Sequence, residues 1–256
     1  MGVTGGGATA WLHALLPAPC LGCVLALPPG PVPFALCRPC RGRLVATPPP
    51  GRCCRLCGAS LAAPGPARRL CGGCRRAPPA FAGLTAPWAY RSPLAEVVQA
   101  LKFRRLAWVG ARLAAPLAAE LAARSVACDL VVPVPLHWRR RLARGYNQAA
   151  ALARPLARRL GLPVAGALVR RRPTPPQTAL PRPARRANPR GAFAVPARHR
   201  RRLAGRRVLL VDDVVTTGAT LDAAARALLA AGAAEVHAAA VARTPAPGAA
   251  AAGRRR

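Results

Sequence analysis

The chain has 256 residues and a formal net charge of +33, from 40 lysines and arginines against 7 aspartates and glutamates. This balance indicates a polyanionic partner, while a hydrophobic content of 52% excludes a wholly disordered basic arm of the histone type. We find no uncharged apolar stretch of about 18 residues in the folded part and no secretory-signal pattern near the N-terminus, so we expect a cytoplasmic protein without a transmembrane segment.

The first 80 residues are expected to form an N-terminal unit with a short helix followed by a cysteine-rich region. The helix spans residues 9–16, carries Trp11 on its apolar side and ends at Pro17. Residues 20–80 are rich in Pro, Gly and Cys and have too few periodic apolar positions for an independent core. Something other than a hydrophobic core must therefore hold this region together.

Eight of the ten cysteines form four Cys-x-x-Cys pairs, and the pattern repeats with an offset of 34 residues. Two such pairs complete the four-thiolate shell that a structural Zn²⁺ prefers, so the repeat predicts two zinc ribbons. Redox chemistry and disulfides are the competing interpretations. A crossed pairing and the use of Cys53 in place of Cys54 stay open, whereas Cys128 is expected to be a small core residue. The predicted zinc ligands are Cys20, Cys23, Cys37, Cys40, Cys54, Cys57, Cys71 and Cys74.

From Phe81 to residue 245 the pattern predicts one α/β domain, followed by a flexible basic tail over residues 246–256. Ser92 as N-cap and Pro93 as first residue are expected to open a helix. The later expected elements are a helix over 110–124 containing Pro116, a strand over 130–134, a helix over 147–160, a strand over 208–211, a helix over 221–231 and a strand over 236–241. This alternation predicts a mostly parallel sheet with helices on both faces, interrupted by a long loop over 170–190.

The most informative segment is 208–220, where a buried strand ends in two acids and a threonine- and glycine-rich turn opens a helix. Such a turn offers N–H groups and hydroxyls at the positive end of a helix, which suits a phosphate monoester. Asp212 and Asp213 come at the carboxyl end of a parallel strand, where open α/β sheets bind ligands. The alternative is a solvated Asx turn in which Thr220 caps the helix.

This segment resembles the phosphoribosyl-pyrophosphate motif of type I phosphoribosyltransferases. The resemblance implies that Asp212 and Asp213 face the ribose 2′- and 3′-hydroxyls, directly or through Mg²⁺-bound water. Adjacent carboxylates would also stabilise positive charge developing on the ribose as pyrophosphate leaves. The resemblance further implies that the 5′-phosphate is held by the turn residues Thr216, Thr217, Gly218, Ala219 and Thr220.

Further motifs resemble one branch of that fold, the ComF family of competence-associated proteins. In chain order they are Leu101-Lys102-Phe103, Pro133-Val134-Pro135-Leu136-His137, Arg144-Gly145-Tyr146-Asn147-Gln148, Gln177-Thr178-Ala179-Leu180, and Arg185-Arg186-Ala187-Asn188 before Gly191-Ala192-Phe193. The resemblance extends over nearly the whole chain. It implies a phosphoribosyltransferase fold behind a double zinc ribbon, a role in DNA uptake during natural transformation and, by analogy, an interaction with the competence helicase.

Other polar residues are candidates for the same site. The turn after Val134 is a candidate pyrophosphate site, with His137, Arg139 and Arg140 as donors; the alternative for His137 is a surface loop histidine. Residues that could line the site are Arg144, Asn147, Gln148, Gln177, Arg185 and Asn188. Asn147 has the alternative role of capping its helix.

These features leave more than one function open. The first is Mg²⁺-dependent binding of phosphoribosyl pyrophosphate, with or without transfer to a base, in a protein of DNA uptake. The second is a basic single-stranded DNA-binding module with a vestigial nucleotide site, in which Trp11, Trp88, Trp108 or Tyr146 would stack on bases. The alternative for most of the aromatic residues is a place in the core or at the domain junction. The third is an active phosphoribosyltransferase of nucleotide salvage. A GC-rich coding bias accounts for the arginine excess, since Lys102 is the one lysine, but it does not account for the shortage of acids.

Overall fold

We describe the chain from a computed structural model, which covers residues 19–49, 51–66, 69–104, 106–171 and 191–245. The expected helix over 9–16, the basic tail over 246–256 and all but the first residues of the long loop lie outside the described residues. Among the described helices, none combines the length and the apolar character needed to cross a membrane.

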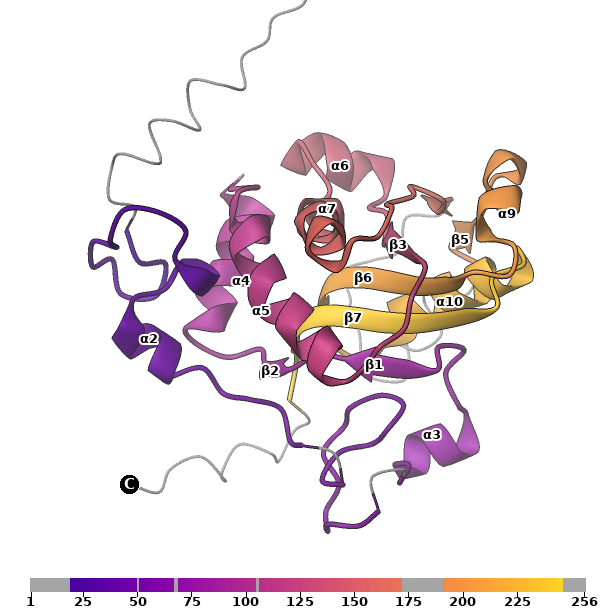
Figure 1. Cartoon of the computed structure of the whole chain (residues 1–256), viewed down its shortest axis with the longest axis horizontal. Helices are drawn as coiled ribbons and strands as arrows, with labels where there is room; N and C mark the ends of the chain where they lie inside the picture. The colour runs from indigo at the N-terminus through magenta and orange to yellow at the C-terminus, as the bar shows by residue number, and fades with distance from the viewer. Residues whose placement is uncertain (1–18, 50, 67–68, 105, 172–190, 246–256) are drawn as a thin grey trace, which may run out of the picture.

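A parallel sheet forms the centre of the fold (Figure 1). Its spatial order is β1 (Gly83–Thr85), β7 (Glu235–Arg243), β6 (Arg207–Val215) and β3 (Leu130–Pro133), with β2 (Trp88–Ala89) also paired to β7. Every one of these pairs is parallel, and Val131 makes a further parallel bridge to Val164. The mostly parallel sheet predicted from the sequence is therefore confirmed, while the short strands β1 and β2 were not predicted.

Helices cover both faces of the sheet (Figure 1), and each face has its own core. One face carries α4 (Leu94–Phe103), α5 (Val109–Ala123) and α7 (Gln148–Leu160), and the other carries α10 (Ala219–Ala230). Successive strand side chains point to opposite faces, so Leu209 and Val211 of β6 pack under α5 and α7, while Val208 and Leu210 pack under α10. The same alternation assigns Asp213 to the α4 side and Asp212 to the α10 side.

Several element ends differ from the expected ones. β6 continues to Val215 rather than ending at residue 211, because Asp212 and Val215 still pair with Ala240 and Arg243 of β7. The prediction of Ser92 as N-cap of α4 is wrong, since Pro93 occupies that position and provides no side-chain cap. The helices expected over 110–124, 147–160 and 221–231 are found within two residues of those bounds.

The remaining elements are too short for their periodicity to be read from the sequence. They are η1 (Pro33–Ala35), α2 (Arg38–Gly42), α3 (Gly72–Arg76), α6 (Trp138–Arg144), β4 (Val169–Arg170), β5 (Phe193–Ala194) and α9 (Ala197–Leu203). β4 and β5 pair antiparallel, so the described residues on either side of the long loop lie next to each other.

The two cysteine-rich units, the first containing Cys20 to Cys40 and the second Cys54 to Cys74, are attached to the domain in different ways. In the first unit, Leu36 is fully buried in the core that also holds α4 and α5, and the Phe34 ring packs edge-on against Trp88 at 4.8 Å. The second unit has a small core of its own around Leu56. A hydrogen bond from the Arg243 guanidinium to the Cys57 carbonyl ties this second unit to β7. The domain boundaries at residues 80 and 245 stay a prediction.

Candidate functional site

The candidate site lies where β3 and β6 end. From β3 the chain runs outward to Val164 and then returns to β6 on the opposite side of β3. Such a reversal opens a crevice between the two strands at their carboxyl ends, which is where open α/β sheets bind ligands. The turns that follow β3 and β6 therefore flank one common site.

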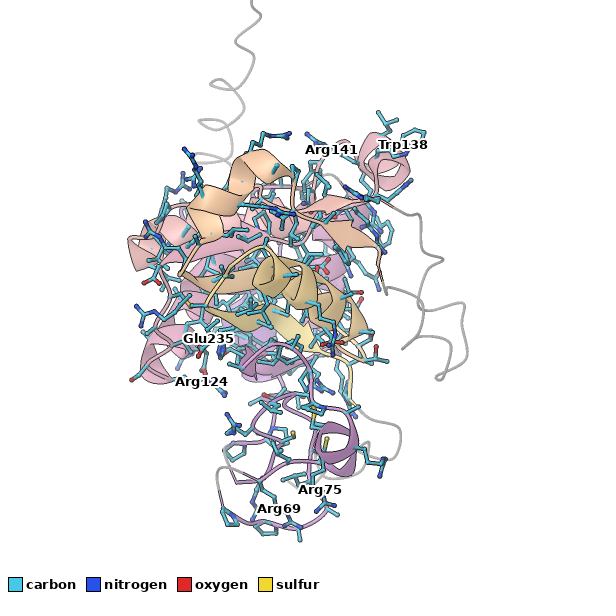
Figure 2. The ribbon with its side chains drawn as sticks, turned by 90° about the vertical axis from the view of Figure 1, so that its right-hand side faces the viewer. Arg69, Arg75, Arg124, Trp138, Arg141 and Glu235 are labelled. Atoms are coloured by element: carbon cyan, nitrogen blue, oxygen red, sulfur yellow. The ribbon has the colours of Figure 1, made fainter. Side chains whose placement is uncertain are left out.

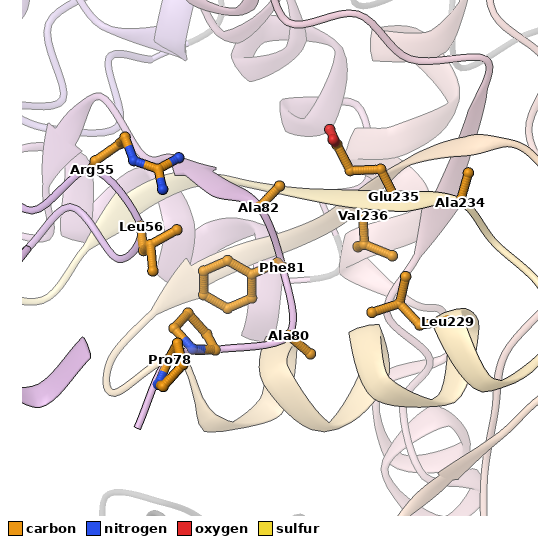
Figure 3. Close-up of a pocket in the computed structure, with 11 residues that line it drawn as sticks. Arg55, Leu56, Pro78, Ala80, Phe81, Ala82, Leu229, Ala234, Glu235 and Val236 are labelled. Atoms are coloured by element: carbon orange, nitrogen blue, oxygen red, sulfur yellow. The ribbon is translucent and has the colours of Figure 1, made fainter. Parts of the chain in front are cut away.

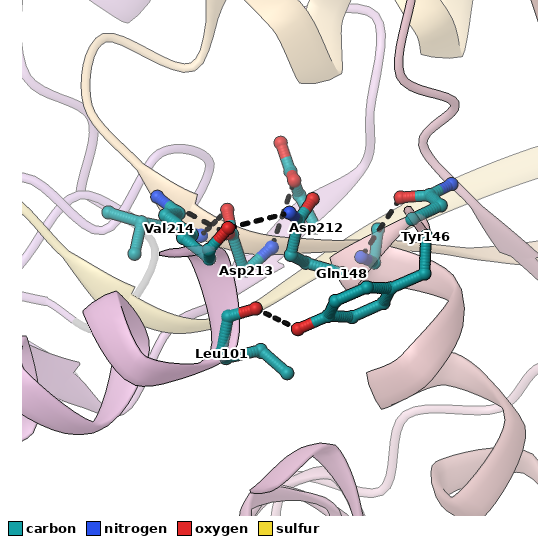
Figure 4. Close-up of polar contacts among 9 residues, drawn as sticks. Leu101, Tyr146, Gln148, Asp212, Asp213 and Val214 are labelled. Carbon is teal, nitrogen blue, oxygen red and sulfur yellow. Dashed lines mark hydrogen bonds and ion pairs between the residues drawn. The ribbon is translucent and has the colours of Figure 1, made fainter. Parts of the chain in front are cut away.

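Asp212 and Asp213 are consecutive residues near the end of β6 (Figure 4). The Asp212 carboxylate accepts a hydrogen bond from the Asp213 backbone N–H at 2.9 Å, and the Asp213 carboxylate accepts one from the Val214 N–H at 2.7 Å. The second Asp213 oxygen lies 3.2 Å from the Lys102 ammonium. Burial, together with the neighbouring Asp213 charge, raises the pKa of Asp212. The acidic pair therefore stands beside a cation, and its net negative charge is reduced.

The turn predicted to hold a phosphate connects β6 to α10. Gly218 precedes the helix with φ of +82°, a left-handed conformation in which a side chain is strained. The Thr217 hydroxyl accepts a hydrogen bond from the Ala219 N–H at 3.3 Å, which closes a local turn. The described geometry thus places hydroxyl-bearing residues and the first N–H groups of a twelve-residue helix next to the acidic pair.

The turn after β3 leads into α6, and its role in binding pyrophosphate stays a prediction. His137 is only 5% exposed and packs against the Trp138 ring at 5.6 Å, so the alternative of a surface loop histidine is wrong. The Arg144 guanidinium lies 5.0 Å from the centre of the Phe103 ring. The side chains of Arg139 and Arg140 lie outside what the structure describes.

Asn147 and Gln148, at the start of α7, hydrogen-bond to backbone groups near the site. Asn147 caps α7 by accepting from the Ala149 N–H at 3.1 Å and donates to the Val134 carbonyl at 3.0 Å, so its alternative role as a cap is confirmed. Gln148 is 2% exposed, and its amide donates to the Lys102 carbonyl at 3.4 Å. The last three candidates lie outside the described residues: Gln177, Arg185 and Asn188.

Lys102 lies beside Asp213 but was not predicted there from the sequence. Its backbone is held by Gln148, and the carbonyl before it, that of Leu101, accepts a hydrogen bond from the Tyr146 hydroxyl (Figure 4). The signal that could have identified it was its uniqueness, because the other 39 basic residues are arginines.

The aromatic residues considered for base stacking fit the alternative assignment to the core, as far as the structure describes them. Trp88, Trp108 and Tyr146 are partly buried and pack against the core under α4 and α5, and Trp11 lies outside the described residues. Two other aromatic side chains are exposed instead, Phe103 by 67% and Trp138 by 58%.

The eight cysteines of the repeat form two clusters in chain order. Within each cluster, all four sulfur atoms lie within 4.8 Å of one another. Cys53 belongs to neither cluster, so the alternatives of a crossed pairing and of Cys53 replacing Cys54 are wrong. The clusters are Cys20, Cys23, Cys37 and Cys40, and Cys54, Cys57, Cys71 and Cys74.

The surroundings of these thiols favour a cation. Burial would raise the pKa of Cys20, but hydrogen bonds from the backbone N–H groups of Cys37 and Gly22 outweigh it and lower that pKa to about 6. Burial and the neighbouring cysteines raise the pKa of Cys40 to about 12. One thiolate of the cluster is thus stabilised, while another is disfavoured by its neighbours. A divalent ion that binds all four sulfurs removes this repulsion between the thiolates.

A separate cavity of about 410 Å³ lies at the amino end of β7, away from the acidic pair (Figure 3). The Phe81 ring lies between Leu56 of the second cysteine unit and Leu229 of α10, and Arg55 and Glu235 also line the cavity. Its walls are mostly apolar, and none of the predicted site residues lines it.

Comparison with known proteins finds a matching family model and several similar proteins. The family model described as "Phosphoribosyl transferase domain" matches residues 147–251. Competence protein F of Haemophilus influenzae is 35% identical over 172 residues, which cover 65% of this chain and 75% of that protein. DNA utilization protein YhgH of Escherichia coli (strain K12) is 36% identical over 172 residues, which cover 65% of this chain and 74% of that protein.

Two solved structures are also similar. Glutamine phosphoribosylpyrophosphate amidotransferase from B. subtilis, complexed with ADP and GMP, aligns with a TM-score of 0.37 and 26% identity, covering 54% of this chain but only 26% of that one. The protein TT1426 from Thermus thermophilus aligns with a TM-score of 0.33 and 19% identity, covering 55% of this chain and 86% of that one. Because both TM-scores are below 0.5, neither structure contributes to the functional assignment.

Proposed function

This chain belongs to the competence protein F family and carries a phosphoribosyltransferase domain, and from this premise we propose that it binds phosphoribosyl pyrophosphate with Mg²⁺ and takes part in DNA uptake. The observation that carries the proposal is the position of Asp212 and Asp213 at the carboxyl end of β6, directly before the threonine turn that opens α10. The acidic pair can accept hydrogen bonds from the two hydroxyls of a ribose, and the helix N-terminus can bind a phosphate. Together they match the two ends of a ribose 5-phosphate.

Each part of the site has a distinct proposed role. The carboxylates of Asp212 and Asp213 accept hydrogen bonds from the ribose 2′- and 3′-hydroxyls or from Mg²⁺-bound water. Thr216, Thr217 and Thr220, with the N–H groups of Gly218 and Ala219, hold the 5′-phosphate. The turn that carries His137, with Arg139 and Arg144 near it, faces the pyrophosphate. When bound, Mg²⁺ neutralises part of the charge on the pyrophosphate.

The site residues can be tested through DNA uptake itself. Asp213→Asn is expected to lose binding of phosphoribosyl pyrophosphate, because it removes one negative charge that faces the ribose. Glu120→Gln is a matched control, since Glu120 is a half-exposed acid of α5 that pairs only with Arg124 among the described residues. If transformation falls with the first variant but not with the second, the nucleotide site serves DNA uptake. Unchanged transformation in the Asp213→Asn strain would contradict that role.

We propose that each four-cysteine cluster holds one structural Zn²⁺. The donor set supports this, because four thiolates within 4.8 Å of one another match the tetrahedral shell of a structural zinc site. Zinc content is the direct measurement: two equivalents per chain are expected, and less than one equivalent in freshly purified protein would contradict the proposal.

Binding of single-stranded DNA is the second candidate function. It is favoured by the net charge of +33 and by the exposed rings of Phe103 and Trp138. The charge is spread over the molecule, since Arg69 and Arg75 lie at one end and Arg141 lies near Trp138 at the other (Figure 2). DNA affinity should therefore fall steeply with salt, by roughly one unit of log–log slope per phosphate contacted.

Trp138→Ala separates stacking from charge in this second function. The variant should weaken binding of single-stranded DNA by about 1–3 kcal/mol and leave the salt slope unchanged. An affinity that barely changes between low and physiological salt would refute binding through the arginines.

A further inference from the structure

The side chain of Lys102 forms an ion pair with one carboxylate oxygen of Asp213. Its ammonium lies 3.2 Å from Asp213 Oδ2, and the two side chains are only 20% and 11% exposed. The ammonium also lies 6.0 Å from the centre of the Tyr90 ring, so an aromatic face borders it as well as a carboxylate. This is a partly buried, positioned ion pair rather than a contact between two solvated side chains.

Several contacts fix the place where this lysine leaves the backbone. Lys102 is in the last turn of α4, directly after the fully buried Leu101. The Tyr146 hydroxyl donates to the Leu101 carbonyl and the Gln148 amide donates to the Lys102 carbonyl at 3.4 Å. Both donors lie at the start of α7, so this segment holds the end of α4 beside β6.

The choice of side chain is also informative. Among 40 basic residues, the chain uses lysine only here. A guanidinium is a planar fork that tends to bind both oxygens of a carboxylate, whereas an ammonium is a compact point charge. In the structure the ammonium takes one oxygen of Asp213, while the other oxygen accepts the Val214 N–H.

From this juxtaposition we infer that the Lys102 ammonium is the counterion of the acidic pair in the absence of ligand. It prevents a divalent ion from binding to the pair alone, and the ion binds only together with a phosphorylated sugar. A fixed positive charge beside Asp213 repels a second cation. A sugar carrying several phosphate charges offsets that repulsion and brings its own bound metal ion. The inference rests on the proposed function, because it names how the same site selects its ligand.

The test measures binding of Mn²⁺ alone, without any sugar phosphate, to the full-length zinc-loaded protein by electron paramagnetic resonance. Lys102→Met is expected to bind Mn²⁺ about tenfold more tightly than the unmodified protein, because the repelling charge is gone. Lys102→Arg keeps the charge and should bind Mn²⁺ as weakly as the unmodified protein. Arg104→Met removes an exposed positive charge two residues away and should change nothing.

A further variant locates the ion. In Lys102→Met combined with Asp213→Asn, the gain in Mn²⁺ affinity should disappear if the ion binds at the acidic pair. Lys102→Met that binds Mn²⁺ within twofold of the unmodified protein would overturn the inference, as would an equal gain in Arg104→Met. Circular dichroism establishes that each variant is folded, and Lys102→Gln replaces Lys102→Met if the latter is not.

Binding of phosphoribosyl pyrophosphate, measured on the same proteins, separates this inference from the proposed function. A protein that gains Mn²⁺ affinity on loss of Lys102 but never binds the sugar phosphate contradicts only the proposed function. A protein that binds the sugar phosphate with Mg²⁺, and whose Lys102→Met variant gains no Mn²⁺ affinity, contradicts only the role of Lys102.

Discussion

Disruption of the first four-cysteine cluster should unfold much more of the protein than disruption of the second. The two clusters have the same ligands but different surroundings. Cys37 and Cys40 belong to the core that α4 and α5 form with the sheet, whereas Cys54 and Cys74 belong to a small separate core. We therefore compare Cys40→Ser with Cys74→Ser, each of which removes one thiolate from one cluster.

The difference in stability follows from the side chains that each unit buries. If the first unit loses its ion and detaches, Leu27, Phe34 and Leu36 leave the main core. At about 1.5–3 kcal/mol for each buried side chain, the loss is roughly 5–9 kcal/mol. That is comparable to the whole free energy of unfolding of a typical domain, which is about 5–15 kcal/mol. The second unit contributes a single large buried side chain, Leu56, to its own small core.

Differential scanning calorimetry with zinc analysis measures the two effects. Cys40→Ser is expected to lower the Tm of the main transition by about 10 °C or more, while Cys74→Ser should lower it by less than about 4 °C. Cys53→Ser is the matched control, because Cys53 lies outside both clusters and should leave zinc content unchanged. Equal shifts for Cys40→Ser and Cys74→Ser would refute the reasoning.

Three further predictions concern packing and reactivity. Tyr146→Phe removes the hydrogen bond to the Leu101 carbonyl and should lower the free energy of unfolding by about 1 kcal/mol in urea; no change would mean that the bond contributes nothing. Gly110→Ala places a methyl group 2.4 Å from the Ala151 carbonyl oxygen and should cost about 1–3 kcal/mol in the same assay, whereas a neutral result would contradict the close contact of α5 and α7. Burial raises the pKa of Cys128 to about 11, which lowers its thiolate fraction at pH 8. Its alkylation at pH 8 should therefore be about 100-fold slower than that of a free cysteine and should accelerate as the pH approaches 11. Fast alkylation at pH 8, measured by mass spectrometry, would contradict the burial.

Much of the fold could be predicted because its long elements have clear periodicity. The strand at 208–211, the helix at 147–160 and the parallel sheet follow from apolar runs alternating with helical patterns, and the structure contains all three. Short elements could not be predicted in this way. β1 and β2 contain three and two residues and are strands only because β7 provides a partner far along the chain.

The two cysteine clusters and the candidate site were predictable to different degrees. Cysteine spacing identifies all eight clustered cysteines, since the Cys-x-x-Cys turn is a local feature that the sequence shows directly. Asn147 contacts the turn after β3, and Gln148 contacts the end of α4. Both partners lie in other parts of the chain, so the spacing of residues within one motif could not predict these contacts. Lys102 was missed for the same reason: its contact with Asp213 joins residues more than a hundred positions apart.

The most direct test of the central claim is calorimetry of phosphoribosyl pyrophosphate binding to the zinc-loaded protein in the presence of Mg²⁺. We predict binding at one site per chain that requires Mg²⁺, is lost in Asp213→Asn and is retained in Glu120→Gln. Absence of binding to the unmodified protein, or equal binding by Asp213→Asn, would contradict the claim that the acidic pair and the threonine turn form a phosphoribosyl site.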